Sequence, residues 1–346
     1  MSKILIAGNS LAVVDAIENI RKNDGQSEIS LLCTESFLPY DRFLLPSLVA
    51  GEIKESQLSP VEHDFFVRHR VEVIANEVLS RVSLKRKHVT TQNKRQIGYD
   101  QLLISDLGSL MSFSIKGHQK KGVFDCALLS SVKDLIKFLP FVDTVFVMAT
   151  NIQGFNMACA FNVLGKEVVI VSPQQSLLSN IFDDETGALL KQIVETKGIR
   201  VITNCIVEEV LGDGEVKAVK LSSGKVVATQ MVIIDSLSLD LRLLEAEEGY
   251  QRIEDKFFSL EAALRPWKFG FNVLNGFCMG LTKLPEKGRE YLKFDGPQDV
   301  FKKIFAQGEC LVGAVLFNAP SHEESLSKFI MEGTSVTGQE ESLLGD

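Results

Sequence analysis

Short apolar runs alternate with helix-period stretches along the first two thirds of this chain. The runs at 3–7 and 144–148 each lead through a turn into a helical stretch, and a second apolar run follows at 28–33 and at 167–171. Two neighbouring parallel strands need a crossover connection between them, which is usually a helix. The pattern therefore predicts two βαβ units, each the beginning of a doubly wound sheet.

The same pattern predicts further elements around these units. The stretch at about 184–197 has its apolar residues on one side, as in an amphipathic helix, and Asp213-Gly214 predicts a hairpin turn. A turn at 306–309 and a helix near 323–332 predict a small C-terminal cap. Further strands are predicted at 71–74, 80–89, 99–105, 198–202, 226–234, 300–305 and 310–317. The predicted fold class is α/β, with two Rossmann-like, three-layer doubly wound units and a small C-terminal α+β domain.

The composition narrows the classes of function. At 346 residues, with 45% hydrophobic and 24% charged residues, the chain is an ordinary globular protein of two or three domains. The formal net charge of −8 argues against a nucleic-acid partner, which needs a basic surface. No apolar run reaches membrane length, and Met1 leads almost directly into a strand. We therefore expect a cytoplasmic protein without a signal peptide or a membrane partner.

The cysteines and histidines do not predict a metal or redox centre. The six cysteines contain no C-x-x-C pair, and the five histidines lack metal-ligand spacing. Scattered cysteines of this kind are typical of small core residues. We therefore expect no metal site and no redox-active disulfide.

The first turn has the position and part of the composition of a G-x-G-x-x-G phosphate-binding loop. It reads Gly8-Asn9-Ser10-Leu11-Ala12-Val13. Glycines in such a loop provide a tight turn, close approach to a pyrophosphate and close packing of helix on strand. Gly8 keeps the turn, whereas Ser10 and Val13 replace the other two glycines. Because Ser10 retains a hydroxyl donor and a helix N-terminus favours an anion, binding there is weakened rather than excluded.

The second turn departs further from this pattern. It reads Ala149-Thr150-Asn151-Ile152-Gln153-Gly154, so that Ala149 and Asn151 replace two glycines and Gly154 alone remains. Asparagine tolerates a positive φ, which would preserve the shape of the backbone. The next strand ends in Ser172-Pro173-Gln174, without the acid that would bind a ribose. These changes favour a βαβ unit that is kept for packing and binds no ligand.

Taken in order, these segments resemble the pyridine nucleotide-disulfide oxidoreductase family, especially its ferredoxin, rubredoxin and nitrite reductase branch. The resemblance covers roughly residues 2–335. It rests on the Gly8 turn, Glu35, Leu38-Pro39-Tyr40-Asp41-Arg42, Tyr99 to Ile104, Gly122-Val123-Phe124, Gly212-Asp213-Gly214 and Cys310 to Val315.

The resemblance implies a division into domains. Residues 1–112 and 235–275 would form an FAD-type domain, truncated near its C-terminal end, and residues 113–234 an NAD(P)-type domain. Residues 276–335 would form a C-terminal dimerisation domain, followed by a flexible tail at 336–346.

The resemblance also assigns roles to single residues. Glu35 matches an acid that binds the adenosine ribose, with a solvated loop acid as the alternative. Arg42 matches an arginine beside the flavin phosphate or ribityl chain, with a surface ion pair as the alternative. Asn156 replaces a glutamate often found near flavin and nicotinamide. The candidate cofactor residues are Gly8, Asn9, Ser10, Leu11, Ala12, Glu35, Arg42, Asn151 and Gly154. No residue is nominated as catalytic.

Two further family segments are altered or missing. The Ala-Thr-Gly segment of the family is replaced by Ser105-Asp106-Leu107-Gly108-Ser109. The late Gly-Asp motif is not found, because the stretch between Ile234 and Phe271 looks too short for its strand, turn and helix. We therefore expect one wall of the flavin site to be lost.

Three hypotheses remain open. The first is a degenerate pseudoenzyme, a structural or regulatory subunit of a redox complex, paired with a second copy or with an intact paralogue. The second is an active flavin-dependent NAD(P)H oxidoreductase, with FAD and NAD(P)H as cofactors, that passes electrons to a small redox protein. The third is an adenine-nucleotide sensor. Whether the protein is an enzyme is not decided by the sequence, because one fold hosts many functions.

Overall fold

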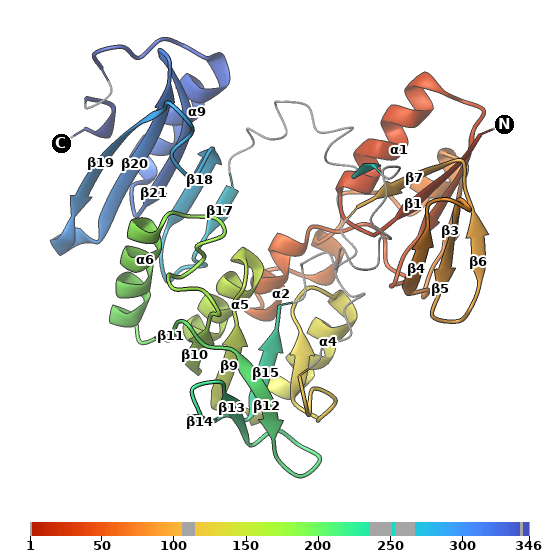
Figure 1. Ribbon diagram of the computed structural model, residues 1–346, viewed down its shortest axis with the longest axis horizontal. Helices are drawn as coiled ribbons and strands as arrows, with labels where there is room; N and C mark the ends of the chain where they lie inside the picture. The colour runs from red at the N-terminus through yellow and green to blue at the C-terminus, as the bar shows by residue number, and fades with distance from the viewer. Residues whose placement is uncertain (1, 106–114, 236–250, 253–266, 340–341, 346) are drawn as a thin grey trace. The chain divides into compact units, whose positions relative to one another are not determined.

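The chain forms two compact units in a computed structural model that describes residues 2–105, 115–235, 251–252, 267–339 and 342–345. The first unit consists of residues 1–114, 124–140 and 235–258. The second unit consists of residues 115–123, 141–234 and 259–346. The units are interleaved along the sequence, and each has its own sheets (Figure 1).

The first unit is built on a parallel sheet of order β16-β7-β1-β2-β3. Its strands are β1 (Lys3–Ala7), β2 (Glu28–Leu32), β3 (Val71–Ile74), β7 (Gln101–Ile104) and β16 (Gln251–Arg252). A smaller antiparallel sheet contains β4 (Leu79–Ser83), β5 (His88–Thr91) and β6 (Gln96–Gly98). The helices are α1 (Ala12–Asn23), α2 (Leu45–Val49), α3 (Phe65–Arg68) and α4 (Leu129–Phe138), with short 3₁₀ turns η1 (Arg42–Leu44), η2 (Glu55–Gln57) and η3 (Leu139–Phe141).

Alternation along β1 explains the layers of this unit. Ile4 and Ile6 pack on one face against Ile17 and its neighbours in α1, which lies beside β1 and β7 in Figure 1. Leu5 and Ala7 pack on the other face against the small β4-β5-β6 sheet. Successive strand residues point to opposite faces, so one buried strand serves two cores.

The second unit contains a parallel core and two antiparallel sheets. The parallel core has the order β11-β10-β9-β15-β8, with α5 between β9 and β10. Its elements are β8 (Val123–Asp125), β9 (Thr144–Met148), α5 (Ile152–Val163), β10 (Glu167–Val171), α6 (Asp184–Thr196), β11 (Arg200–Ile202) and β15 (Met231–Ile234). A three-stranded sheet contains β12 (Val207–Leu211), β13 (Ala218–Leu221) and β14 (Val226–Ala228).

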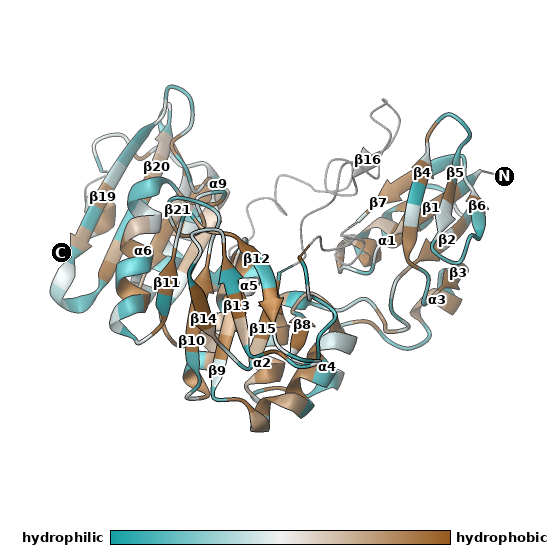
Figure 2. Ribbon diagram, turned by 60° about the horizontal axis from the view of Figure 1, so that its bottom comes forward, coloured by the Kyte–Doolittle hydropathy of each residue, from teal (hydrophilic) through white to brown (hydrophobic). Residues whose placement is uncertain are grey.

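The C-terminal part of this unit is an antiparallel sheet of order β17-β18-β21-β20-β19, covered by α9. Its elements are β17 (Trp267–Phe269), β18 (Gly276–Gly280), β19 (Arg289–Asp295), η5 (Gly296–Gln298), β20 (Val300–Gln307), β21 (Cys310–Phe317), η6 (Pro320–His322), α9 (Glu323–Glu332) and η7 (Ser342–Leu344). Val336 and Leu344, in the segment expected to be a flexible tail, are buried against this sheet. Figure 2 shows polar residues along the edge strand β19 and on α6.

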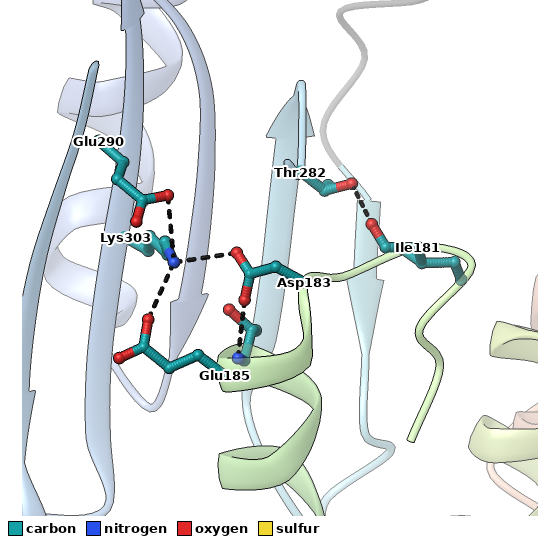
Figure 3. Close-up of polar contacts among 7 residues, drawn as sticks. Ile181, Asp183, Glu185, Thr282, Glu290 and Lys303 are labelled. Carbon is teal, nitrogen blue, oxygen red and sulfur yellow. Dashed lines mark hydrogen bonds and ion pairs between the residues drawn. The ribbon is translucent and has the colours of Figure 1, made fainter. Parts of the chain in front are cut away.

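A buried lysine joins α6 to the C-terminal sheet (Figure 3). Lys303 on β20 is 1% exposed, and its Nζ lies 2.9 Å from Asp183 Oδ2, 3.2 Å from Glu185 Oε2 and 3.3 Å from Glu290 Oε2. Asp183 also caps α6, because its Oδ1 accepts from the amide of Thr186 at 2.8 Å. Nearby, the Thr282 hydroxyl donates to the carbonyl of Ile181.

The fold class and the hairpin predicted from the sequence are confirmed, and two local details add to the picture. The stretch between Ile234 and Phe271 does contain a late strand, β16, which pairs in parallel with Leu103 and Ile104 of β7. Residues 253–266, where the sequence shows no Gly-Asp motif, lie outside the described residues. The predicted hairpin joins β12 to β13, but the positive φ values fall on Gly212 and Gly214 rather than on Asp213.

Candidate nucleotide sites

The turn after β1 keeps the geometry of a phosphate-binding loop. Gly8 has a φ of 128°, and its amide donates to the carbonyl of Leu32 at 2.9 Å. α1 then begins with no side chain capping its N-terminus, and Leu11 stands at the cap position with ordinary helical angles. The first amides of an α-helix have no partner inside the helix and carry a partial positive charge. This end of α1 is therefore suited to an anion.

Two side chains of this turn are buried or paired. Asn9 is 2% exposed; its Nδ2 donates to the carbonyl of Phe37 at 3.2 Å, and its Oδ1 has no partner among the described residues. The hydroxyl of Ser10 makes a hydrogen bond with that of Ser105, which directly follows β7. Ser105 thus joins the turn, although its neighbours in the altered segment, residues 106–109, lie outside the described residues.

Glu35 is 5% exposed and holds the start of α4. Its Oε1 accepts from the amide of Ser130 at 2.8 Å, and its Oε2 accepts from the hydroxyl of Tyr40 at 2.7 Å. The hydroxyl of Tyr40 in turn accepts from the amide of Leu129 at 2.9 Å. No side chain at the cap position supplies these bonds, since that residue is a leucine. Glu35 is therefore buried and engaged rather than a solvated loop acid.

The surroundings keep Tyr40 protonated. Burial and then the charge of Glu35 raise the pKa of Tyr40 far above its ordinary value, so its hydroxyl remains a donor. Arg42 is 8% exposed, and its guanidinium carbon lies 5.9 Å from the centre of the Tyr40 ring. Arg42 begins η1, which Asp41 caps through the amide of Phe43. This arginine is thus buried beside an aromatic ring rather than exposed on the surface.

The second turn has a different geometry from the first. Asn151 has a φ of −145°, and neither it nor Ala149 is among the described residues with positive φ, so the expected glycine-like shape is wrong here. Instead, Asn151 Oδ1 accepts from the amide of Gln153 at 2.8 Å and from that of Gly154 at 3.4 Å. Asn151 is therefore the N-cap of α5, and its oxygen takes the amides that would face a phosphate.

The rest of α5 is enclosed. All its residues from Ile152 to Phe161 are buried. Asn156 Oδ1 accepts from the amide of Gly270 at 2.8 Å, and the ring of Phe155 lies 6.2 Å from that of Phe269. Asn156, which replaces the family's glutamate, thus fixes the segment after β17 onto the helix.

The cysteines are mainly core residues, as expected. Five of the six are buried, and all are free. Burial, followed by the charge of Glu35, raises the pKa of Cys33 to about 11, so little reactive thiolate forms near neutral pH. Within the described parts of the chain, no three His, Cys, Asp or Glu side chains are grouped to hold a metal. No helix in those parts combines the length and apolar character needed to cross a bilayer.

Sequence reasoning missed Ser105, the Tyr40 contact with Glu35 and the capping role of Asn151. Tyr40 lies five residues after Glu35 within the Leu-Pro-Tyr-Asp-Arg segment, which was a usable signal. The bond from Glu35 to Ser130 spans 95 residues, and nothing local in the sequence indicates it.

Comparison with known proteins places these features in a family. The model for pyridine nucleotide-disulphide oxidoreductases matches residues 2–236. The assimilatory nitrate reductase electron transfer subunit of Bacillus subtilis is 22% identical over 67% of this chain and 30% of its own length. The rubredoxin-NAD(+) reductase of Ectopseudomonas oleovorans is 22% identical over 67% of this chain and 60% of its own length.

A solved structure gives the fold. The covalent complex of putidaredoxin reductase with putidaredoxin contains a chain that matches with a TM-score of 0.77 and 14% identity, covering 100% of this chain and 96% of that one. The chain spans only about a third to three fifths of the two relatives above. With a family model matched over more than half of its length, the chain belongs to the pyridine nucleotide-disulphide oxidoreductase family.

Proposed function

We propose that this chain is a flavin-dependent oxidoreductase that binds FAD in its first unit and passes electrons to a small redox protein. The observation that carries the proposal is the uncapped N-terminus of α1 behind Gly8. The family and the putidaredoxin complex of a protein with the same fold support the redox partner.

The residues of the first unit fit the pyrophosphate of FAD. No side chain caps the start of α1, where the amides of Val13 and Val14 bond to the carbonyls of Ser10 and Leu11, so the partial positive charge of the helix end is not neutralised by a side chain; the hydroxyls of Ser10 and Ser105 lie at the same turn. Arg42 adds a buried cation suited to phosphate. Asn9 Oδ1, a buried acceptor without a donor, would be satisfied by a ligand hydroxyl or amino group. These groups supply donors, and one acceptor, of the kinds that a dinucleotide needs.

Glu35 has a different role in this proposal. Its carboxylate accepts two protein amides and the Tyr40 hydroxyl, so we assign it to holding α4 rather than to binding a ribose. FAD, when bound, would supply the redox chemistry, and the chain would supply position and electrostatics. No acid, base or nucleophile of the chain is assigned a proton transfer.

A non-catalytic subunit of a redox complex is the second candidate. It is favoured by Asn151 and Glu35, because each stands at a position where a nucleotide ligand was expected and instead bonds to the chain's own amides. In this case the partner would be a second copy or an intact paralogue. One relative is itself named as an electron transfer subunit.

The visible spectrum of the purified chain separates the candidates. We expect a yellow protein that releases flavin in stoichiometric amount on denaturation and that, once reduced with dithionite, is reoxidised by a small one-electron redox protein. Colourless protein that takes up no FAD would contradict the proposal and leave the non-catalytic subunit. A rise in melting temperature with AMP or ADP, but not with FAD, would instead favour an adenine-nucleotide sensor.

A further inference from the structure

We propose that the side chain of Asn151 closes the second unit to the pyrophosphate of a dinucleotide, so that NAD(P)H does not bind there. The inference goes beyond the proposed function, since it concerns the other unit and another ligand. It is argued from the described contacts at the start of α5.

The amides that would hold the pyrophosphate already have an acceptor. In the first unit, the start of α1 has no side-chain cap. In the second unit, Asn151 Oδ1 lies 2.8 Å from the amide nitrogen of Gln153 and 3.4 Å from that of Gly154. A phosphate oxygen must displace this amide oxygen before it can use the same donors. The neutral side chain of Asn151 therefore accepts the hydrogen bonds that a phosphate oxygen would otherwise accept.

The backbone also cannot approach a ligand as closely as in a glycine loop. Gly8 has a φ of 128° in the first turn, whereas the corresponding Ala149 is fully buried and has no positive φ. Asn151 adds a Cβ where close approach to the pyrophosphate needs glycine. The second turn thus lacks the positive φ of the first, whereas at the close-approach position both turns carry a side chain, Ser10 and Asn151.

The block is specific to phosphate. Gln174, just after β10, has a buried Oε1 that finds no donor among the described residues. Its carbonyl oxygen would suit a ribose hydroxyl, and the neutral carboxamide offers a phosphate no positive charge. The end of β10 therefore does not offset the loss of donors at α5.

Binding measurements on the full chain test this inference without reference to activity. NADH and NADPH are titrated separately by calorimetry and by thermal melting, with FAD in excess so that FAD rather than NAD(P)H occupies the first turn. With Asn151 in place, we expect no saturable binding up to about 1 mM, the upper end of ordinary substrate affinities. In Ala149→Gly/Asn151→Gly, binding should tighten by about tenfold or more, because the cap and both side chains are gone.

Two variants control for folding and for the substitution itself. Asn151→Asp keeps the cap and adds a negative charge, so it should fold and still not bind. Asn204→Gly is the same change at an exposed residue of the second unit with a φ of 53°, where glycine fits, and should leave binding unchanged.

The inference is overturned if the chain with Asn151 binds NADH or NADPH with a micromolar Kd. It is also overturned if Asn151→Asp binds as tightly as the double variant, or if the double variant, folded by circular dichroism, binds no better than its parent. Flavin content is measured on the same samples. Loss of the proposed flavin function therefore remains distinguishable from failure of this inference.

Discussion

At the scale of single residues, polar groups that look like ligand contacts in the sequence are used to hold the protein's own backbone. Glu35 caps α4, Asn151 caps α5, and Asn156 accepts from the amide of Gly270. A buried helix end must satisfy its free amides with some acceptor. Where the family uses a ligand, this chain has an acceptor of its own.

Removal of Glu35 should therefore destabilise the protein. Glu35→Ala leaves the amide of Ser130 and the hydroxyl of Tyr40 without their acceptor, while the amide of Leu129 keeps its bond to the Tyr40 hydroxyl. We expect a loss of about 1–3 kcal/mol in the free energy of unfolding, measured by urea denaturation. Glu28→Ala, which removes an exposed carboxylate 3.9 Å from Lys3, is the control and should change stability by less than about 1 kcal/mol. Equal effects of the two substitutions would mean that Glu35 does not hold α4.

The ion pairs of Lys303 should make a pH-dependent contribution to the stability of the folded protein. Burial alone would raise the pKa of Asp183, but the amide of Thr186 and the ammonium of Lys303 lower it below its ordinary value. Burial alone would lower the pKa of Lys303, and its carboxylate partners raise it above its ordinary value. The depressed carboxylate stabilises the fold above its unfolded pKa, so this contribution falls as pH drops below about 4. The raised lysine stabilises the fold up to about pH 10 and loses its contribution above that.

Lys303→Met tests this cluster. It keeps the apolar stem and removes the charge, and we expect it to cost about 1–3 kcal/mol at neutral pH, by the scale of hydrogen bonds to charged groups. The deficit relative to the parent chain should begin to shrink as pH falls below about 4 and should close only below the lowered pKa of Asp183. Lys283→Met, at an exposed lysine, is the matched control. A deficit that is the same at pH 3 and pH 7 would contradict the electrostatic origin.

At the scale of elements, a strong hydrophobic pattern makes the core strands and helices predictable. The edge strands of the sheets have a weak pattern and are not predictable in this way. β1, β9 and β10 have continuous apolar runs, and α9 was placed at 323–332, where the structure has it. β19 was missed because most of its residues are exposed at the edge of the sheet, which leaves no alternation to detect. β16 was missed because it has only two residues. Its pairing with β7 is a long-range contact that sequence pattern does not contain.

The candidate site was less predictable than the fold, for a related reason. The position of the Gly8 turn follows from strand and helix pattern, whereas the expectation that its helix end favours an anion stays a prediction. The engagement of Glu35 with α4 and of Ser10 with Ser105 depends on pairs separated by 95 residues. Local sequence pattern predicts which polar groups lie near the turn. It does not predict which of them already have a hydrogen-bond partner within the protein.

The junction of β18 and β21 should tolerate no side chain at Gly313. A Cβ there would lie 1.9 Å from the carbonyl oxygen and 2.6 Å from the nitrogen of Leu281. The opposing backbone would have to move, so Gly313→Ala should cost about 1–3 kcal/mol of unfolding free energy. Gly25→Ala is the matched control, because a Cβ at Gly25 has no atom within 4 Å. If thermal melting shows no difference between the two variants, the sheet is more adaptable at this point than the structure implies.

At the scale of the whole molecule, architecture and chemistry are separable. Two parallel-sheet units and an antiparallel C-terminal sheet follow the pattern of a reductase across the full chain. The first unit retains an open helix end, whereas the second caps its own. A fold of this kind can keep one cofactor site and lose another, since each depends on a few residues at one turn.

Net charge should govern how the proposed flavoprotein meets its electron acceptor. With a formal charge of −8, the chain attracts cations and repels anions over distances of about a Debye length, roughly 10 Å at 0.1 M salt. Stopped-flow reoxidation of the reduced flavin should therefore slow with added NaCl when the one-electron acceptor is a basic protein. With an acidic acceptor of similar potential the rate should rise instead, because salt screens a repulsion. An acidic acceptor that reacts faster at low salt would show that a local basic surface, rather than the net charge, directs the encounter.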